Sequence, residues 1–144
     1  MFVKQITLFI ENRPGRLSEF TALLAAHDID LVAISVADTT HFGILRVIVN
    51  DCDRAAEVLR DSGYTVNLTD VLAVAVPDTP GGLAHVMALL YEKQIAIEYL
   101  YSLVRRVGHQ AVIIVRVDKR QEAVELFVEK GVKLILQSDI AGTK

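Results

Sequence analysis

Apolar residues recur along this chain at two alternating spacings. In "VKQITLFI", residues 3–10, they occupy every second position, which predicts a strand with one buried face. Leu17, Phe20 and Leu24 then follow at the three- and four-residue spacing of a helix. The Pro-Gly pair at 14–15 separates the two patterns. Proline is expected in the first turn of that helix, because the N–H that it lacks is not needed there.

Four further elements follow the first helix. The β-branched runs at 29–39 and 42–51 predict two strands around a turn. Residues 51–63 begin with aspartate and end with glycine, which are the usual start and stop signals of a helix. "YTVNL", residues 64–68, predicts a closing strand. The expected order is therefore βαββαβ.

The whole pattern then repeats, and internal repeats of this length indicate duplicated structural units. Pro14-Gly15 recurs 66 positions later as Pro80-Gly81, whereas Gly63 recurs 68 positions later as Gly131. Two extra residues near "SLVRRVGHQ", residues 102–110, explain the change of offset. The elements expected in the second copy lie at 71–76, 80–93, 96–104, 110–118, 120–131 and 132–136.

Strands that lie between helices, with two crossovers per copy, predict an α+β fold. We expect two ferredoxin-like modules at 1–69 and 70–144, each an antiparallel sheet with helices on one face. No Gly/Ser or Pro-rich spacer separates them, so we expect the copies to pack firmly. The runs "LAVAV" and "AVIIVRV" are apolar enough to be covered on both faces, which favours a homodimer.

Composition narrows the class of protein. The net charge is −3, which argues against a nucleic-acid partner. No apolar run reaches the roughly 18 residues of a membrane span. The first ten residues alternate like a strand rather than a signal peptide, and Cys52 is the single cysteine, so we expect a cytoplasmic protein.

The two Pro-Gly turns carry the candidate chemistry. A turn that leads into a helix presents unpaired backbone N–H groups and the positive end of the helix dipole, which suits a carboxylate. Gly15 and Gly81 let a ligand approach the backbone closely. Asn12 and Asp78 add a polar side chain at equivalent places. An α-amino acid is the kind of ligand that such a turn would hold.

Catalytic and metal sites are not predicted. His41 and His109 occupy matching turns, but no cysteine or carboxylate lies beside them at ligand spacing. Asp51 and Asp53 flank Cys52 and disfavour a reactive thiolate. We therefore expect no enzyme, no cofactor and no metal.

Both copies follow the βαββαβ order, and in the first copy the motif "ENRPGRL" lies between a strand and a helix and is followed by "IDL". On these features, each copy resembles the ACT domain. ACT domains are small regulatory modules that bind amino acids. "FIENRPGRLSEFTALLAAHDIDLVAISV" is similar to the serine-sensing module of phosphoglycerate dehydrogenase, and equally to the start of the acetolactate synthase regulatory subunit. No catalytic domain accompanies the two copies. The resemblance therefore implies a free-standing tandem-ACT protein.

The resemblance also implies where a ligand sits, between two modules. Each Pro-Gly turn would face the start of the second strand of the other copy, so that 12–17 would face 95–97 and 78–83 would face 29–31. The residues implied as ligand-binding are Asn12, Arg13, Pro14, Gly15, Arg16, Leu17, Asp30, Leu31, Asp78, Thr79, Pro80, Gly81, Gly82, Leu83, Ala96 and Ile97.

Two departures from the serine-sensing pattern point away from serine. Its asparagine at the start of the second strand is replaced by Asp30 and Ala96. Its histidine, two residues before the asparagine of the motif, is replaced by Ile10 and Val76. These replacements favour a larger or more apolar ligand side chain.

The leading interpretation is an amino-acid sensor that is a homodimer and acts on an enzyme or regulator that the sequence does not name. One alternative is a regulatory subunit of a biosynthetic enzyme such as acetolactate synthase. Another is a dimerisation module without ligand, in which the turns are structural. Arg13 and Arg16 either hold a ligand carboxylate or are simply solvated.

Overall fold

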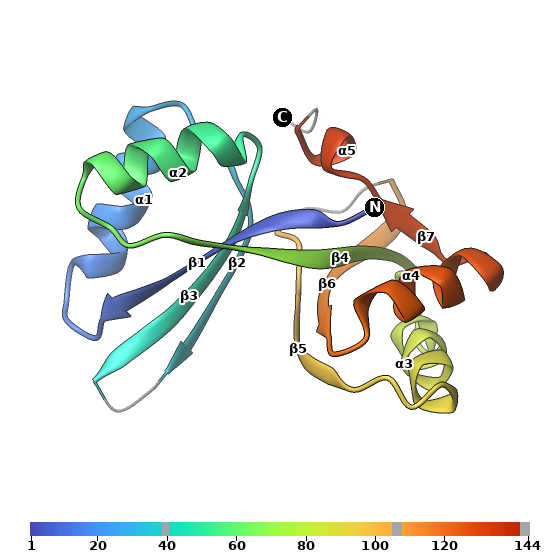
Figure 1. Ribbon diagram of the computed structural model, residues 1–144. Coiled ribbons are helices and arrows are strands. Elements are labelled where there is room, and N and C mark those ends of the chain that lie inside the picture. Colours follow the sequence, from blue (N-terminus) through green and yellow to red (C-terminus); the bar gives the residue numbers. More distant parts are fainter. Residues whose placement is uncertain (39–40, 105–107, 142–144) are drawn as a thin grey trace. The chain divides into compact units, whose positions relative to one another are not determined.

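The fold is α+β and consists of two ferredoxin-like modules, as the sequence predicts (Figure 1). It was obtained as a computed structural model, and the structure describes residues 1–38, 41–104 and 108–141. The elements are β1 (Val3–Glu11), α1 (Arg16–Ala26), β2 (Leu31–Asp38), β3 (Phe42–Val49), α2 (Cys52–Asp61), β4 (Asn67–Pro77), α3 (Gly82–Glu92), β5 (Ile97–Ser102), β6 (Gln110–Val117), α4 (Arg120–Glu129), β7 (Lys133–Ile135) and α5 (Gln137–Ala141).

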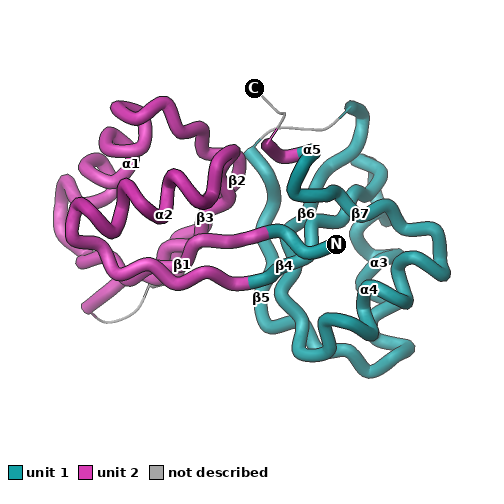
Figure 2. The backbone as a smooth tube through the Cα atoms, turned by 45° about the horizontal axis from the view of Figure 1, so that its top comes forward, with its two compact units in different colours: residues 1–3, 70–139 teal, residues 4–69, 140–144 magenta. Residues whose placement is uncertain are grey.

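The chain forms two compact units, which are coloured separately in Figure 2. The amino-terminal unit contains residues 4–69 and 140–144, and the carboxy-terminal unit contains residues 1–3 and 70–139. Each unit holds one copy of the repeat, apart from these short terminal segments. The expected module boundary between residues 69 and 70 stays a prediction.

In the amino-terminal unit, β3 lies between β1 and β2, and both pairings are antiparallel. Leu8 lies opposite Leu45, and both side chains point to the face on which α1 and α2 pack. Phe20 and Leu24 of α1 are at most 1% exposed in this core. The strand alternation and the helical spacing therefore meet in one layer of apolar side chains.

The carboxy-terminal unit repeats this arrangement. Its strand order is β7-β4-β6-β5, again antiparallel. Leu72 lies opposite Val115, and both belong to the core that the helices α3 and α4 cover. Leu90 and Phe127 supply the helical side of this core.

β4 is longer than the sequence predicts. The closing strand of the first copy was expected at 64–68, but β4 begins at Asn67 and continues without interruption to Pro77. Residues 64–66 stay outside it because the end of α2 engages the backbone: the Tyr64 N–H donates to the Leu59 carbonyl at 3.0 Å. One strand thus starts in the amino-terminal unit and ends in the carboxy-terminal unit.

Both faces of β4 are buried, as its apolar sequence predicts. The six residues 71–76 are each at most 5% exposed. Residues 71–76 are therefore buried on both sides of the strand. The homodimer stays a prediction.

The strand register locates the two extra residues of the second copy. Val36 lies opposite Leu45, whereas its equivalent Ser102 lies opposite Ile113, which is two positions further than a constant offset would give. The insertion therefore falls between β5 and β6, within the expected segment; residues 105–107 of that segment lie outside the described part of the chain. The sequence did not predict α5, where Asp139 Oδ2 accepts a hydrogen bond from the Leu136 N–H at 2.9 Å.

Candidate ligand-binding turns

Both Pro-Gly pairs form type II β-turns that lie immediately before a helix. The Arg16 N–H donates to the Arg13 carbonyl at 3.3 Å and closes the first turn. Gly15 at its third position has φ 90° and ψ −16°, a left-handed conformation that favours glycine. The second turn is the same, with φ 90° and ψ −10° at Gly81.

This geometry corrects the expected place of the prolines. Pro14 and Pro80 were expected in the first turn of a helix, but α1 begins at Arg16 and α3 at Gly82. A left-handed residue cannot continue a right-handed helix, so the glycine becomes the N-cap and the proline lies before it. The fixed φ of proline serves the second position of the type II turn instead.

The glycine N-caps leave the starts of α1 and α3 open. Because glycine has no side chain, Gly15 and Gly81 make no side-chain hydrogen bond to their helices in the described structure. α2 differs, since Asp51 caps it by accepting from the Arg54 N–H at 3.2 Å. The Arg16 and Gly82 N–H groups close the two turns, and the other first-turn N–H groups of α1 and α3 are available to an anion.

Four charged side chains surround the first turn. Glu11 accepts from Arg13 Nε at 2.7 Å and from Arg16 Nη2 at 3.3 Å. Arg16 Nη1 also contacts Glu19 Oε2 at 3.2 Å. These side chains are 36–63% exposed, so each pair contributes at most about 1 kcal/mol. Both arginines are therefore ion-paired while partly exposed to solvent, and the pairs are weak enough to exchange.

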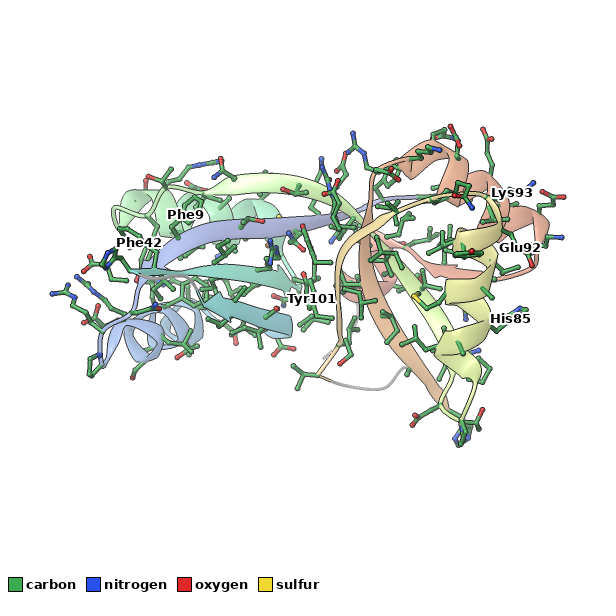
Figure 3. All side chains as sticks on the ribbon, turned by 90° about the horizontal axis from the view of Figure 1, so that it is seen from below. Phe9, Phe42, His85, Glu92, Lys93 and Tyr101 are labelled. Atoms are coloured by element: carbon green, nitrogen blue, oxygen red, sulfur yellow. The ribbon has the colours of Figure 1, made fainter. Side chains whose placement is uncertain are left out.

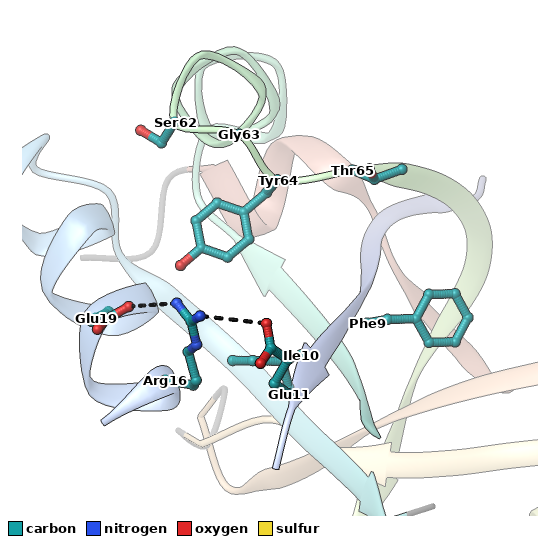
Figure 4. A pocket seen from close by; sticks show the side chains of 9 residues that line it. All are labelled: Phe9, Ile10, Glu11, Arg16, Glu19, Ser62, Gly63, Tyr64 and Thr65. Carbon is teal, nitrogen blue, oxygen red and sulfur yellow. Dashed lines mark hydrogen bonds and ion pairs between the residues drawn. The ribbon is translucent and has the colours of Figure 1, made fainter. Parts of the chain in front are cut away.

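A hollow of about 550 Å³ lies beside this turn. Figure 4 shows Arg16 between Glu11 and Glu19, with the hydroxyl of Tyr64 directed toward them and the ring of Phe9 directed away. The size is in the range of small-molecule sites. The residues that line the hollow are Phe9, Ile10, Glu11, Arg16, Glu19, Ser62, Gly63, Tyr64 and Thr65.

The second turn has a different environment. A Cβ atom at Gly82 would lie 2.1 Å from the carbonyl oxygen of Pro77, so the start of α3 rests directly on the end of β4. The first copy has Glu11 and Arg16 at these two positions. Asp78 and Thr79 are exposed. The turns share a backbone shape but not a set of side chains.

The starts of β2 and β5 are held by residues that the sequence analysis missed. The Asp30 N–H donates to Asn50 Oδ1 at 2.9 Å, and the Ala96 N–H donates to Asp118 Oδ1 at 3.0 Å. Asn50 and Asp118 occupy equivalent positions of the repeat, which is the signal that would have identified them. The backbone N–H groups at two implied ligand positions are therefore engaged within their own units.

Four of the implied residues of the first copy divide among three hollows. Arg16 lines the one just described. Asn12 and Arg13 line a second, of about 490 Å³, and Asp30 lines a third, of about 380 Å³. Leu17 is 41% exposed on α1, and Leu31 begins β2 half-buried.

In the second copy, Leu83 lies in the first turn of α3 and Ile97 begins β5. The expected approach of each turn to the other copy stays a prediction. The sequence analysis missed Glu11, Glu19 and Tyr64, although Glu11 directly precedes the motif.

The described side chains contain no group of three or more metal-ligating residues. His85 lies with Glu92 and Lys93 on the outer side of α3 (Figure 3), and all three are exposed. Among the described residues, no helix combines the length and apolar character that a membrane span requires.

Cys52 is a buried structural residue rather than a nucleophile. It is 8% exposed. Burial raises the pKa of its thiol, and the carboxylate of Asp53 raises that pKa further. The pKa of the Cys52 thiol is thus higher in the folded than in the unfolded state. The contribution of this thiol to the stability of the fold is therefore fully present below the unfolded-state pKa, and it is lost as the pH rises through the folded-state pKa.

We expect Cys52 in the native protein to react with iodoacetamide at pH 8 at least roughly tenfold more slowly than in urea-unfolded protein. Burial and the scarcity of thiolate both slow the native reaction. Mass spectrometry of timed samples measures the two rates. Similar rates in both states would show that the thiol is accessible.

The comparison with known families now places the chain. A sequence model of the ACT domain pair matches residues 1–143. The chain therefore belongs to the ACT domain family, as an ACT domain pair, which confirms the resemblance seen in the sequence. ACT domain pairs are typical of small-molecule-binding regulatory proteins.

Solved structures agree with this assignment. The structure of protein BT0572 from Bacteroides thetaiotaomicron is 38% identical, with a TM-score of 0.92, over 99% of this chain and 98% of that one. The ligand-free regulatory subunit of aspartate kinase from Thermus thermophilus is 18% identical, with a TM-score of 0.62, over 88% and 91%; it supports the fold alone. A search of curated proteins found no match.

Proposed function

We propose that this protein is an amino-acid-binding regulatory protein that carries no catalytic activity of its own and acts in the cytoplasm. The observation that carries the proposal is the pair of type II Pro-Gly turns, each with a left-handed glycine as N-cap. Each turn offers the N–H groups and positive dipole end that bind a carboxylate. The chain is an ACT domain pair, a class typical of small-molecule-binding regulatory proteins, which supports this proposal.

Regulation then follows from differential affinity. A ligand that prefers one conformation of the chain shifts the population toward it, by no more than the difference in binding free energy. An enzyme or regulator then binds the conformation that the ligand favours.

A second candidate is a regulatory subunit bound permanently to an amino-acid biosynthetic enzyme. The observation that favours it is the fold shared with the aspartate kinase regulatory subunit from Thermus thermophilus over 88% of this chain. Co-purification with a large catalytic subunit would support this candidate. A module that only dimerises is the third reading.

A thermal-shift screen against the twenty amino acids tests the proposal. A ligand that binds only the folded state stabilises it by about 2.7 kcal/mol at one hundred times its Kd. We expect at least one amino acid to raise the melting temperature, and calorimetry then gives its affinity. The absence of any shift at millimolar concentrations would contradict ligand binding and favour the dimerisation module.

Substitution of the turn glycines connects binding to the turns. We expect the double variant Gly15→Ala/Gly81→Ala to lose affinity, because alanine strains a φ near +90° and narrows the approach to the helix start. Gly131→Ala is the matched control, since Gly131 also has positive φ and open space around it but lies away from the turns. Unchanged binding in the double variant would place the site elsewhere.

A further inference from the structure

We propose that the two copies are not equivalent and that each chain binds one amino-acid zwitterion, in the hollow beside the first turn. The proposal rests on the proposed function and adds to it the number of sites, their place and the groups that recognise the ligand. It follows from the charged side chains that the structure brings together around Arg16.

The first copy offers both signs of charge within one hollow. The Arg16 guanidinium contacts Glu11 and Glu19 at 3.3 and 3.2 Å, and all three side chains line the same hollow. A zwitterion needs a cation for its carboxylate and carboxylates for its ammonium. The lining supplies each of these groups from a strand end and the first turn of a helix.

Binding can proceed by exchange of partners. The ligand carboxylate takes Arg16, for which a planar guanidinium is well suited. The ligand ammonium takes the released Glu19 and also Glu11, which keeps its ion pair with Arg13. Charge is conserved and no ion is left unpaired. The three side chains are 36–63% exposed, so the exchange requires no opening of the core.

The second copy lacks these groups. The repeat places Pro77 where the first copy has Glu11, Gly82 where it has Arg16, and His85 where it has Glu19. The ammonium thus loses both carboxylates and the carboxylate loses its guanidinium. Lys130 and Lys133, in place of Ser62 and Thr65, add positive charge that repels an ammonium.

The second turn also has no room for a side chain at the position of Arg16. The start of α3 rests on the Pro77 carbonyl so tightly that even a methyl group at Gly82 would overlap it. The first copy carries a full arginine side chain at the same position. The atom in the way is a backbone oxygen, and a change of rotamer does not move it.

Calorimetry tests the proposal with whichever of the twenty amino acids binds. We expect one molecule per chain, and roughly tenfold or greater weakening in Arg16→Gln and in Glu19→Gln. The amide of the same amino acid lacks the carboxylate charge, so it should bind the wild-type chain more weakly than the amino acid does, by a similar factor. His85→Gln, at the position equivalent to Glu19, is the matched control in the second copy and should leave the affinity unchanged. Circular dichroism confirms that each variant is folded.

The outcomes separate the two proposals. Two molecules per chain, or binding that His85→Gln abolishes and Arg16→Gln leaves intact, would overturn the assignment to the first turn while keeping the proposed function. Equal affinity for the amino acid and its amide would overturn recognition of the carboxylate by Arg16. No binding of any amino acid by the folded wild-type chain would overturn the proposed function itself.

Discussion

Gly82→Ala is expected to lower the melting temperature by roughly 6–12 °C. The new methyl carbon would lie 2.1 Å from the backbone oxygen of Pro77, and 3.2 Å from its carbonyl carbon. Neither atom belongs to a flexible side chain, so α3 or the end of β4 must move. Overpacking of this kind costs about 3 kcal/mol. Thermal unfolding followed by circular dichroism measures the effect.

Two controls accompany Gly82→Ala. Arg16→Ala, at the equivalent position of the first copy, removes only two exposed ion pairs, with Glu11 and Glu19, and should shift the melting temperature little. Gly81→Ala strains the turn but meets no atom within 4 Å, so its cost should be intermediate. A Gly82→Ala variant as stable as Arg16→Ala would show that the helix start has room to relax.

Phe20→Ala is expected to cost about 3–5 kcal/mol of unfolding free energy. Phe20 is fully buried, and its ring meets that of Tyr64 edge-on at 6.0 Å. Its removal leaves a cavity and also releases Tyr64, which lines the hollow beside the first turn. Urea unfolding measures the stability, and ligand affinity in the same variant should fall as well.

Phe20→Leu and Tyr64→Phe dissect this effect. Leucine refills most of the cavity and should cost less than half as much as alanine. Tyr64→Phe keeps the ring contact and removes only the hydroxyl, so it should alter affinity more than stability. A Phe20→Ala variant of wild-type stability would contradict the core described for the amino-terminal unit.

Periodicity and repetition predicted the fold because both follow the spacing of buried positions, which the geometry of a strand or a helix sets. Alternation in 3–10 and helical spacing from Leu17 to Leu24 each describe one buried face, and the repeat tested each element twice. The start of β4 was predicted less well, because the hydrogen bonds that end α2 engage Tyr64 before the strand begins. The spacing of apolar residues in the sequence does not show how far the hydrogen bonds at the end of a helix extend.

The candidate turns were predicted, whereas their surroundings were not. Pro-Gly spacing fixes a turn, but whether the prolines lie inside the helix depends on the φ of Gly15 and Gly81, which the letters do not show. The pairing of Arg16 with Glu11 and Glu19 depends on side-chain directions at a strand end. Comparison of the two copies, Arg16 against Gly82, would have indicated their difference from the sequence alone.

The unbroken course of β4 has a consequence for how this chain tolerates changes of length in evolution. Successive side chains of a strand point to opposite faces of the sheet. One residue added or lost between Asn67 and Pro77 would therefore move every later side chain of the strand to the opposite face. The second copy has gained two residues between β5 and β6 instead, where a loop absorbs them. We expect related chains to differ in length at the hairpins and to keep the number of residues in β4 constant.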